Sequence, residues 1–142
     1  MFDDLYNTEI LTLSASLKNE YLEELHGTSR KVSKLCGSWV EIDVQLKAGL
    51  VAACALRVEA CALGQSAAAI LQQNIIGASL NEISEAVLAL RAMLKEGAEP
   101  PTGRFAKLAL LRGVQAYPVR HTSTLLAFEA AREAVQMALE NA

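Results

Sequence analysis

The sequence predicts an α+β fold, an antiparallel sheet covered by helices, in a single domain spanning residues 1–142. The chain has 142 residues, of which 52% are hydrophobic, and that is enough to build one core. Between residues 39 and 60, hydrophobic and polar residues alternate with the two-residue period of strands. In the later segments, hydrophobic residues recur with the period of helices. Strands followed by helices are typical of α+β proteins.

The N-terminal half is predicted to contain one helix and the sheet. Leucine and isoleucine recur at three- and four-residue steps from Asp3 to about Leu17, which indicates a helix. Thr28–Ser33 alternates weakly and is predicted to be an edge strand. Trp39–Leu46 is the clearest strand, and Leu50–Ala60 follows it after a glycine-containing turn as the second arm of a hairpin.

The alternation of this hairpin assigns each side chain to one face of the sheet. We expect one face to be buried, with residues Val40, Ile42, Val44, Leu46, Cys54, Leu56 and Val58. We expect the other face to be exposed to solvent, with residues Glu41, Asp43, Gln45, Arg57, Glu59 and Cys61.

The C-terminal half is predicted to be helical. A first helix covers Ala62–Ile76, and a second begins at the capping box of Ser79 and Glu82 and ends at a glycine. A short helix over Arg104–Leu111 and a turn over Gly113–Pro118 come next. The last helix is predicted from about Thr122 to Leu139.

The composition excludes several classes of function. A net charge of −3 and an aromatic content of 5% argue against nucleic acid as a partner. No apolar stretch is long enough to span a membrane, and the acidic start is unlike a signal peptide, so we expect a cytoplasmic protein. The motifs of nucleotide-binding proteins, zinc proteases and serine hydrolases are missing from the sequence, so an enzyme is not expected.

Two of the three cysteines are candidates for metal binding. Cys54 lies on the buried face and is predicted to be a core residue. Cys61 lies where a strand gives way to a helix, and the N–H groups and dipole of a helix start favour a thiolate. Cys36 precedes the first arm of the hairpin, so the hairpin should bring it to the same end of the sheet as Cys61.

His121 is the candidate for a third ligand. It lies just before the last helix, where Thr122 or Ser123 can act as the N-cap and leave the histidine in the loop. Zinc and iron sites accept thiolate and imidazole together, whereas a serine hydroxyl is a poor ligand. The basic residues between Pro101 and Phe128 are either a docking surface for an acidic partner or solubilising charge.

Four segments together resemble the NifU/IscU-type scaffolds for iron–sulfur cluster assembly over roughly Gly27–Leu139. Leu35–Ser38 resembles the family's C-G-D element, with serine in place of aspartate. Ala60–Ala69 resembles its second cysteine segment. Pro118–Ala127 resembles its third cysteine segment, with Ser123 at the position of that cysteine, and Ser79–Glu82 resembles a helix start.

This resemblance implies a three-stranded sheet flanked by helices, with a metal site at one end. It also implies a scaffold that binds iron, or a nascent iron–sulfur cluster, with cysteine desulfurase and cluster-accepting proteins as partners. We therefore predict Cys36, Cys61 and His121 as ligands, in a monomer or weak homo-oligomer. Two alternatives remain open: a zinc-binding sulfur acceptor or adaptor on the same fold, and an interaction module without cluster chemistry.

Overall fold

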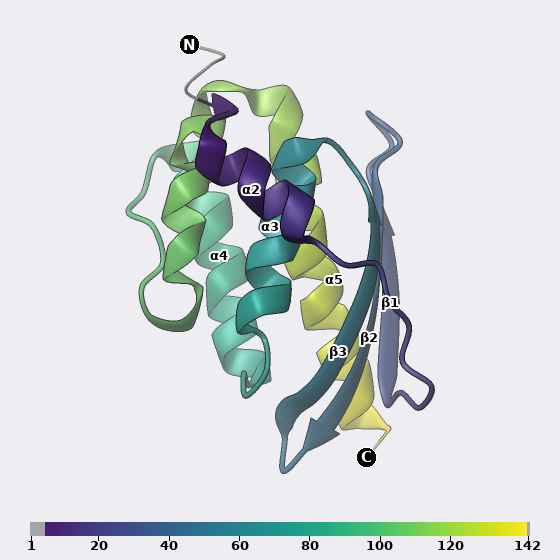
Figure 1. Ribbon diagram of the computed structural model, residues 1–142. Coiled ribbons are helices and arrows are strands. Elements are labelled where there is room, and N and C mark those ends of the chain that lie inside the picture. The colour runs from purple at the N-terminus through teal and green to yellow at the C-terminus, as the bar shows by residue number, and fades with distance from the viewer. Residues whose placement is uncertain (1–4, 142) are drawn as a thin grey trace.

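A computed structural model describes residues 5–141 and shows a three-stranded antiparallel sheet with helices packed against it (Figure 1). The predicted α+β fold is therefore confirmed. The elements follow one another as α2 (Thr8–Ser16), β1 (Gly27–Val32), β2 (Trp39–Lys47), β3 (Leu50–Glu59), α3 (Ala62–Asn74), α4 (Leu80–Glu96), η1 (Gly103–Ala116), η2 (Pro118–Arg120) and α5 (His121–Glu140). Asp3 and Asp4, the first residues of the predicted N-terminal helix, lie outside the described residues.

The sheet has the strand order β1-β2-β3, and its register determines which loops meet. Trp39, the first residue of β2, pairs with Val32 of β1 and with Glu59 of β3. The β1–β2 turn and the β3–α3 connection therefore lie at the same end of the sheet. The β2–β3 turn lies at the opposite end, where Ala48 and Gly49 adopt positive φ angles of 54° and 78°.

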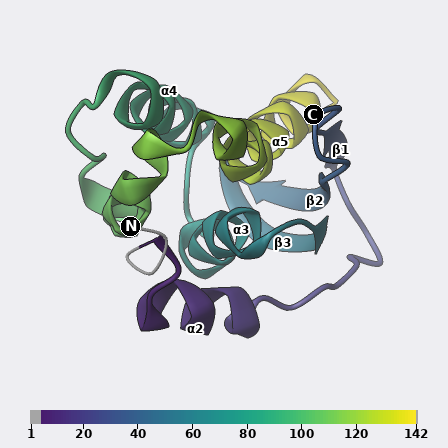
Figure 2. The same cartoon turned by 90° about the horizontal axis from the view of Figure 1, so that it is seen from above.

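The core lies between the sheet and the helices, and α5 packs across β1 and β2 while α3 contacts β3 (Figure 2). The alanine-rich sequence of α3 allows this helix to lie close to α2, α5 and η1 at once, and its Ala67, Ala68 and Ala69 are fully buried. The capping box of Ser79 and Glu82 is present at the start of α4, as predicted.

The segment after the two prolines differs from its prediction. The 3₁₀ segment η1, which is kinked at Phe105, replaces the short helix Arg104–Leu111 and extends to Ala116 through most of the predicted turn Gly113–Pro118. The buried side chains of this stretch recur at every third residue: Phe105, Leu108, Leu111 and Val114. Because a 3₁₀ helix has three residues per turn, it places all four against the core on one side.

The outer face of the sheet is also less exposed than its alternation predicts. Asp43 and Arg57 are only 3% and 8% exposed, although both were expected to face solvent. The segment between α2 and β1 crosses this face, and its Leu22 N–H donates to Asp43 at 3.3 Å. The carbonyl of Glu20 accepts from Arg57 at 2.9 Å. This segment, residues 17–26, covers the charged side chains of Asp43 and Arg57, which the alternation of the strands predicts to be exposed to solvent.

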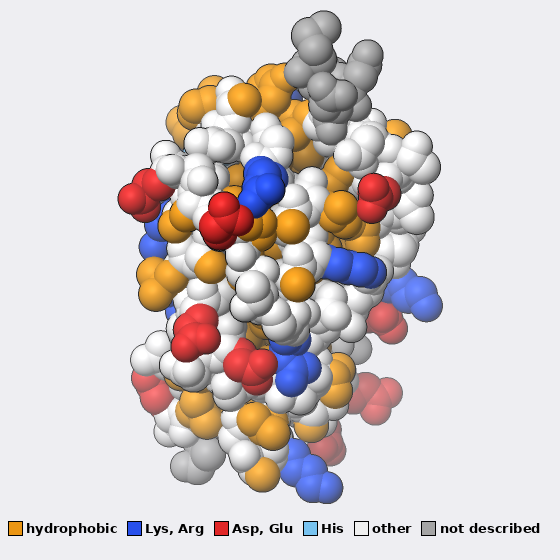
Figure 3. Space-filling model, turned by 90° about the vertical axis from the view of Figure 1, so that its left-hand side faces the viewer, with side chains coloured by type: hydrophobic (Ala, Val, Ile, Leu, Met, Phe, Trp, Pro, Cys, Tyr) orange, Lys and Arg blue, Asp and Glu red, His pale blue; other side chains and the backbone are white. Residues whose placement is uncertain are grey.

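The surface over α4 and η1 carries positive and negative side chains interspersed with one another (Figure 3). Two of the basic residues between Pro101 and Phe128 form ion pairs there, Arg104 with Glu82 and Arg112 with Glu99. Within residues 5–141, no helix has the length and apolar character needed to cross a membrane.

Candidate metal centre

Cys36 and Cys61 line one open hollow with a volume of about 270 Å³ at the end of the sheet. Three chain segments meet there: the β1–β2 turn, the β3–α3 connection and the start of α5. The lining residues are Cys36, Gly37, Ser38, Glu59, Ala60, Cys61 and Arg120. The fold thus brings together two thiols that are 25 residues apart in the sequence.

Cys36 is an exposed thiol held by two serine hydroxyls in the β1–β2 turn. Its Sγ lies 3.4 Å from Ser33 Oγ and 3.1 Å from Ser38 Oγ, and both serines are buried. Hydrogen bonding with the side chain of Ser33, and with the side chain and backbone of Ser38, lowers the pKa of the Cys36 thiol, and the charge of Arg120 lowers it further. Cys36 is therefore both accessible and stabilised as a thiolate.

Cys61 is the N-cap residue of α3, and its thiol is half-buried. Its Sγ lies 3.7 Å from Ser123 Oγ in the first turn of α5. The approach of α5 to α3 at this point is very close, because a Cβ added to Gly64 would lie 3.1 Å from the Ser123 carbonyl oxygen. Gly64 thus allows the helix that carries Ser123 to pack beside the thiol of Cys61.

The charge distribution around the hollow favours anionic sulfur. The N-terminal ends of α3 and α5 both lie at the hollow, and neither helix has an acidic residue in its first turn. Arg120 adds a guanidinium to these two positive dipole ends. Glu59 is the acidic side chain in the lining, and it is exposed.

His121 occupies a different place from the one expected. It is the first residue of α5 rather than the end of a loop, and it is only 6% exposed. Its Nε2 lies 3.0 Å from the carbonyl oxygen of Val114 and 3.2 Å from that of Gln115. Because carbonyl oxygens only accept hydrogen bonds, Nε2 donates to them and the ring is directed toward the end of η1. The imidazole does not line the hollow of the two thiols.

Ser123 is not the N-cap that the sequence predicts. The N-cap position of α5 belongs to Arg120, and Ser123 Oγ donates to the Arg120 carbonyl oxygen at 3.1 Å. The short helix η2 leads directly into α5, which begins at His121, one residue before the expected start at Thr122. Ser123 therefore contacts Cys61 from within the helix.

Cys54 is separate from this hollow. It packs against the hydrophobic core from the middle of β3, and burial raises the pKa of its thiol to about 12. It therefore remains a neutral thiol at physiological pH, as expected for a core cysteine.

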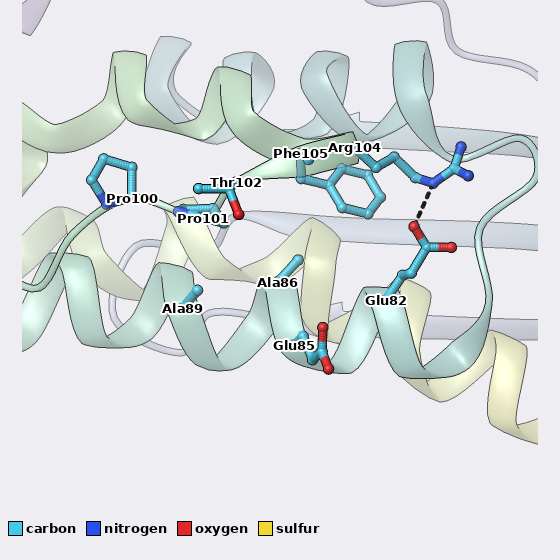
Figure 4. A pocket seen from close by; sticks show the side chains of 10 residues that line it. Glu82, Glu85, Ala86, Ala89, Pro100, Pro101, Thr102, Arg104 and Phe105 are labelled. Carbon is cyan, nitrogen blue, oxygen red and sulfur yellow. Dashed lines mark hydrogen bonds and ion pairs between the residues drawn. The ribbon is translucent and has the colours of Figure 1, made fainter.

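A second, more voluminous pocket of about 350 Å³ lies between α4 and residues 100–105 (Figure 4). Its polar side chains have structural partners: Arg104 pairs with Glu82 at 3.0 Å and donates to the carbonyl oxygen of Ile76 at 2.8 Å. Arg104 thus fastens the start of η1 to the end of α3. No motif in the sequence predicts this pocket, and thiol or imidazole groups do not line it.

The donors in the hollow suit soft metal ions. Thiolates bind iron and zinc, and two of them are present at one surface. Within residues 5–141, no three histidine, cysteine or acidic side chains lie close enough together to hold a metal ion. Ser33 was not among the predicted site residues, although the spacing Ser33-x-x-Cys36 within a turn indicates that the two side chains can meet.

Comparisons with known proteins agree with this architecture. No protein-family model and no curated protein sequence matches the chain. Its structure superimposes on the N-terminal part of a NifU-like nitrogen-fixing protein from Brucella abortus with a TM-score of 0.95 and 37% identity, over 99% of both chains.

Two further solved structures share the fold at lower identity. A putative iron–sulfur cluster assembly scaffold protein for the SUF system, from Fervidobacterium islandicum AW-1, has a TM-score of 0.83 and 21% identity over 92% of this chain and 96% of that one. A hypothetical protein matches with a TM-score of 0.81 and 19% identity, over 90% and 94%. The match to the Brucella protein at 37% identity over 99% of the chain shows that this chain belongs to the NifU-like family of iron–sulfur cluster assembly scaffolds.

Proposed function

We propose that the protein is an iron–sulfur cluster assembly scaffold or carrier that binds iron, or a nascent cluster, through Cys36 and Cys61. The observation that carries this proposal is the meeting of these two thiols in one open hollow of a NifU-like fold. A scaffold needs thiolates near the surface, because the cluster has to enter and leave. The exposure of Cys36 and the half-burial of Cys61 meet that need.

The role of this site is to bind and release its cargo rather than to catalyse a reaction on a small substrate. The partners that follow are a cysteine desulfurase, which would supply sulfur, and proteins that accept the finished cluster. We place this exchange in the cytoplasm. The lowered pKa of Cys36, caused first by its hydrogen bonding with Ser33 and Ser38, supports this role because it favours the anionic sulfur that binds iron.

The third ligand stays a prediction. His121 can serve only if its ring leaves the carbonyl oxygens of Val114 and Gln115 and turns toward the hollow. Comparing His121→Ala with Ser123→Ala decides this: we expect iron affinity to fall in the histidine variant and to remain in the serine variant. The reverse result would identify Ser123, and not His121, as the third ligand.

A second candidate is a zinc-binding sulfur acceptor on the same fold. The lowered pKa of Cys36 supports this role too, because an exposed thiolate is the form that attacks a sulfur donor. Zinc and a cluster can be told apart because an iron–sulfur cluster absorbs visible light and zinc does not.

The test is reconstitution without oxygen, using ferric iron and sulfide, followed by visible absorption and metal analysis. We expect absorption bands in the natural protein and in Cys54→Ser, and their loss in Cys36→Ser and in Cys61→Ser. Binding of zinc without any cluster would favour the sulfur acceptor. Binding of neither metal, with a cysteine desulfurase still bound, would show an interaction module.

A further inference from the structure

The turn between β1 and β2 is closed by main-chain hydrogen bonds. The N–H group of Ser33 donates to the carbonyl oxygen of Ser38 at 2.8 Å, and the N–H group of Gly37 donates to that of Ser33, also at 2.8 Å. Gly37 completes the turn with a positive φ angle of 74°. Because these bonds use backbone atoms, we expect the turn to keep its shape when a serine hydroxyl is removed.

Two buried hydroxyls of this turn lie against the exposed sulfur of Cys36. Ser33 is 1% exposed and Ser38 is 7% exposed. The Cys36 thiol donates to Ser33 Oγ at 3.4 Å, and its Sγ lies 3.1 Å from Ser38 Oγ. Buried hydroxyls in proteins keep a hydrogen-bond partner. A sulfur that has lost its proton to bind iron only accepts hydrogen bonds, so the Ser33 hydroxyl then rotates and donates to it.

Cys61 lacks this support. Its Sγ lies 3.7 Å from Ser123 Oγ, but the Ser123 hydroxyl donates to the carbonyl oxygen of Arg120 at 3.1 Å. A hydroxyl has a single hydrogen, so that of Ser123 is directed away from Cys61. In the part of the chain that the structure describes, the two thiols of the hollow therefore differ. Two hydroxyls can donate to Cys36, whereas Cys61 faces a hydroxyl that is already engaged.

We propose that Ser33 is a positioning residue that makes Cys36 the exchangeable ligand of the two, so that cargo is released from Cys36 while Cys61 still holds it. The inference rests on the proposed function. Hydrogen bonds to a ligating sulfur withdraw negative charge from it and alter the potential of the metal centre. With the Ser33 and Ser38 hydroxyls bonded to it, the Cys36 sulfur donates less charge to iron than the Cys61 sulfur does.

The exchange at Cys36 needs an incoming thiol and no change of oxidation state. The thiol of an accepting protein loses its proton, and its sulfur forms a bond to iron as the bond between Cys36 and iron breaks. Cys36 leaves as a thiolate and takes up a proton, so protons, charge and electrons balance. The exposure of Cys36 gives an incoming thiol access to this position, whereas Cys61 is half-buried.

Ser33→Ala tests the proposal after reconstitution without oxygen from ferric iron and sulfide. Glutathione is the probe for the incoming thiol, and the loss of visible absorption measures release. We expect release to be slower than in the natural protein, on the order of tenfold, because one hydrogen bond to a charged group is lost. We also expect a more negative reduction potential, because that hydrogen bond no longer stabilises an added electron.

Ser29→Ala is the matched control. Ser29 is also buried, and its hydroxyl donates to Glu133 at 3.0 Å from β1, outside the hollow. Release and reduction potential should therefore match those of the natural protein. Circular dichroism should show the same fold in both variants, since main-chain bonds close the turn of residues 33–38.

Labelling of the loaded protein checks which sulfur leaves first. N-ethylmaleimide is added as a thiol reagent, and each cysteine is followed by peptide mass spectrometry together with the visible absorption. In the natural protein we expect Cys36 to be modified before Cys61. In Ser33→Ala, modification of Cys36 should slow, and modification of Cys61 should still follow the loss of absorption.

Unchanged release and an unchanged potential in Ser33→Ala would overturn the inference and leave the proposed function intact. Faster release, or a variant that forms no cluster, would also overturn it, because the hydroxyl would then strengthen the ligand. Modification of Cys61 before Cys36 in the natural protein would contradict the order of release. A natural protein without visible absorption after reconstitution would overturn the proposed function, and the inference with it.

Discussion

The hollow at the end of the sheet and the middle of the sheet contain the same three kinds of residue in different surroundings. A cysteine, a carboxylate and an arginine are present at each place: Cys36, Glu59 and Arg120 at the hollow, and Cys54, Asp43 and Arg57 at mid-sheet, where Cys54 lies on the face opposite to the other two. At mid-sheet the arginine and the carboxylate are buried and bonded to each other at 2.7 Å. In the hollow the corresponding charges are not paired with each other, and the thiol is exposed.

Burial decides whether these residues serve stability or binding. Arg57 donates two hydrogen bonds to the carboxylate of Asp43 beneath the segment of residues 17–26. The centre of the Tyr21 ring lies 4.1 Å from the guanidinium of Arg57. They stabilise the fold and have no capacity left for a ligand. Cys36 and Arg120 lie at an edge where three segments meet, so their thiol and charge remain available to a ligand.

Reactivity of the thiols should show the largest contrast. Burial raises the pKa of Cys54 to about 12. The thiolate fraction of such a thiol at neutral pH is on the order of a thousandfold below that of an ordinary thiol. Iodoacetamide should therefore modify Cys36 first and Cys54 last, as measured by peptide mass spectrometry over time. In unfolded protein, all three cysteines should react alike. Equal rates for Cys36 and Cys54 in the folded protein would break the comparison.

Arg57→Ala should have the largest effect on stability. It leaves Asp43 as a buried carboxylate without its main partner, and breaking a buried pair in this way costs about 3–5 kcal/mol. Urea unfolding followed by circular dichroism measures the loss. Arg30→Ala is the control, because its pair with Glu41 is more exposed and contributes less than about 1 kcal/mol. A similar loss in the two variants would show that burial does not separate these pairs.

Acid should weaken the mid-sheet pair. Burial raises the pKa of the Asp43 carboxyl, but hydrogen bonds from Arg57, Leu22 and Thr28 outweigh it, and the net pKa is lowered. Folding therefore favours the ionised carboxylate. Its contribution to stability is complete above the pKa in the unfolded chain, about 3.9, and is lost as the pH falls through the lower pKa of the folded state. The free energy of unfolding should decline below about pH 4, and less steeply in Asp43→Asn; equal slopes would contradict this.

Cys54→Ala should have the smallest effect. It trims one small, largely buried group, so the expected loss of stability is on the order of 1 kcal/mol. Cluster absorption should be unchanged, because Cys54 does not line the hollow. Cys61→Ala should do the reverse, with lost absorption and a largely retained fold. A folded Cys54→Ala protein without a cluster would contradict the separation of the two cysteine environments.

The order of the elements could be predicted because each pattern is local. The alternation of Trp39–Leu46 and the capping box at Ser79 predict structures that residues within a few positions of one another form. The convergence of Cys36 and Cys61 could also be expected, because an antiparallel hairpin brings its two open ends together. The segment η1 was predicted only in part, although the three-residue spacing of its buried side chains is the period of a 3₁₀ helix and not of an α-helix.

Local sequence patterns were enough to predict the α+β order of elements, the hairpin and the two cysteines at its open end. Which polar groups are buried depends on contacts between distant segments. Asp43 and Arg57 lie under the segment of residues 17–26, and His121 lies against the carbonyl oxygens at the end of η1. The physical reason is distance along the chain. Periodicity records which side of its own element a residue faces, whereas burial depends on which distant segment crosses that side. The partners of Asp43 and His121 come from other elements, so only the assembled fold shows that these side chains are already engaged.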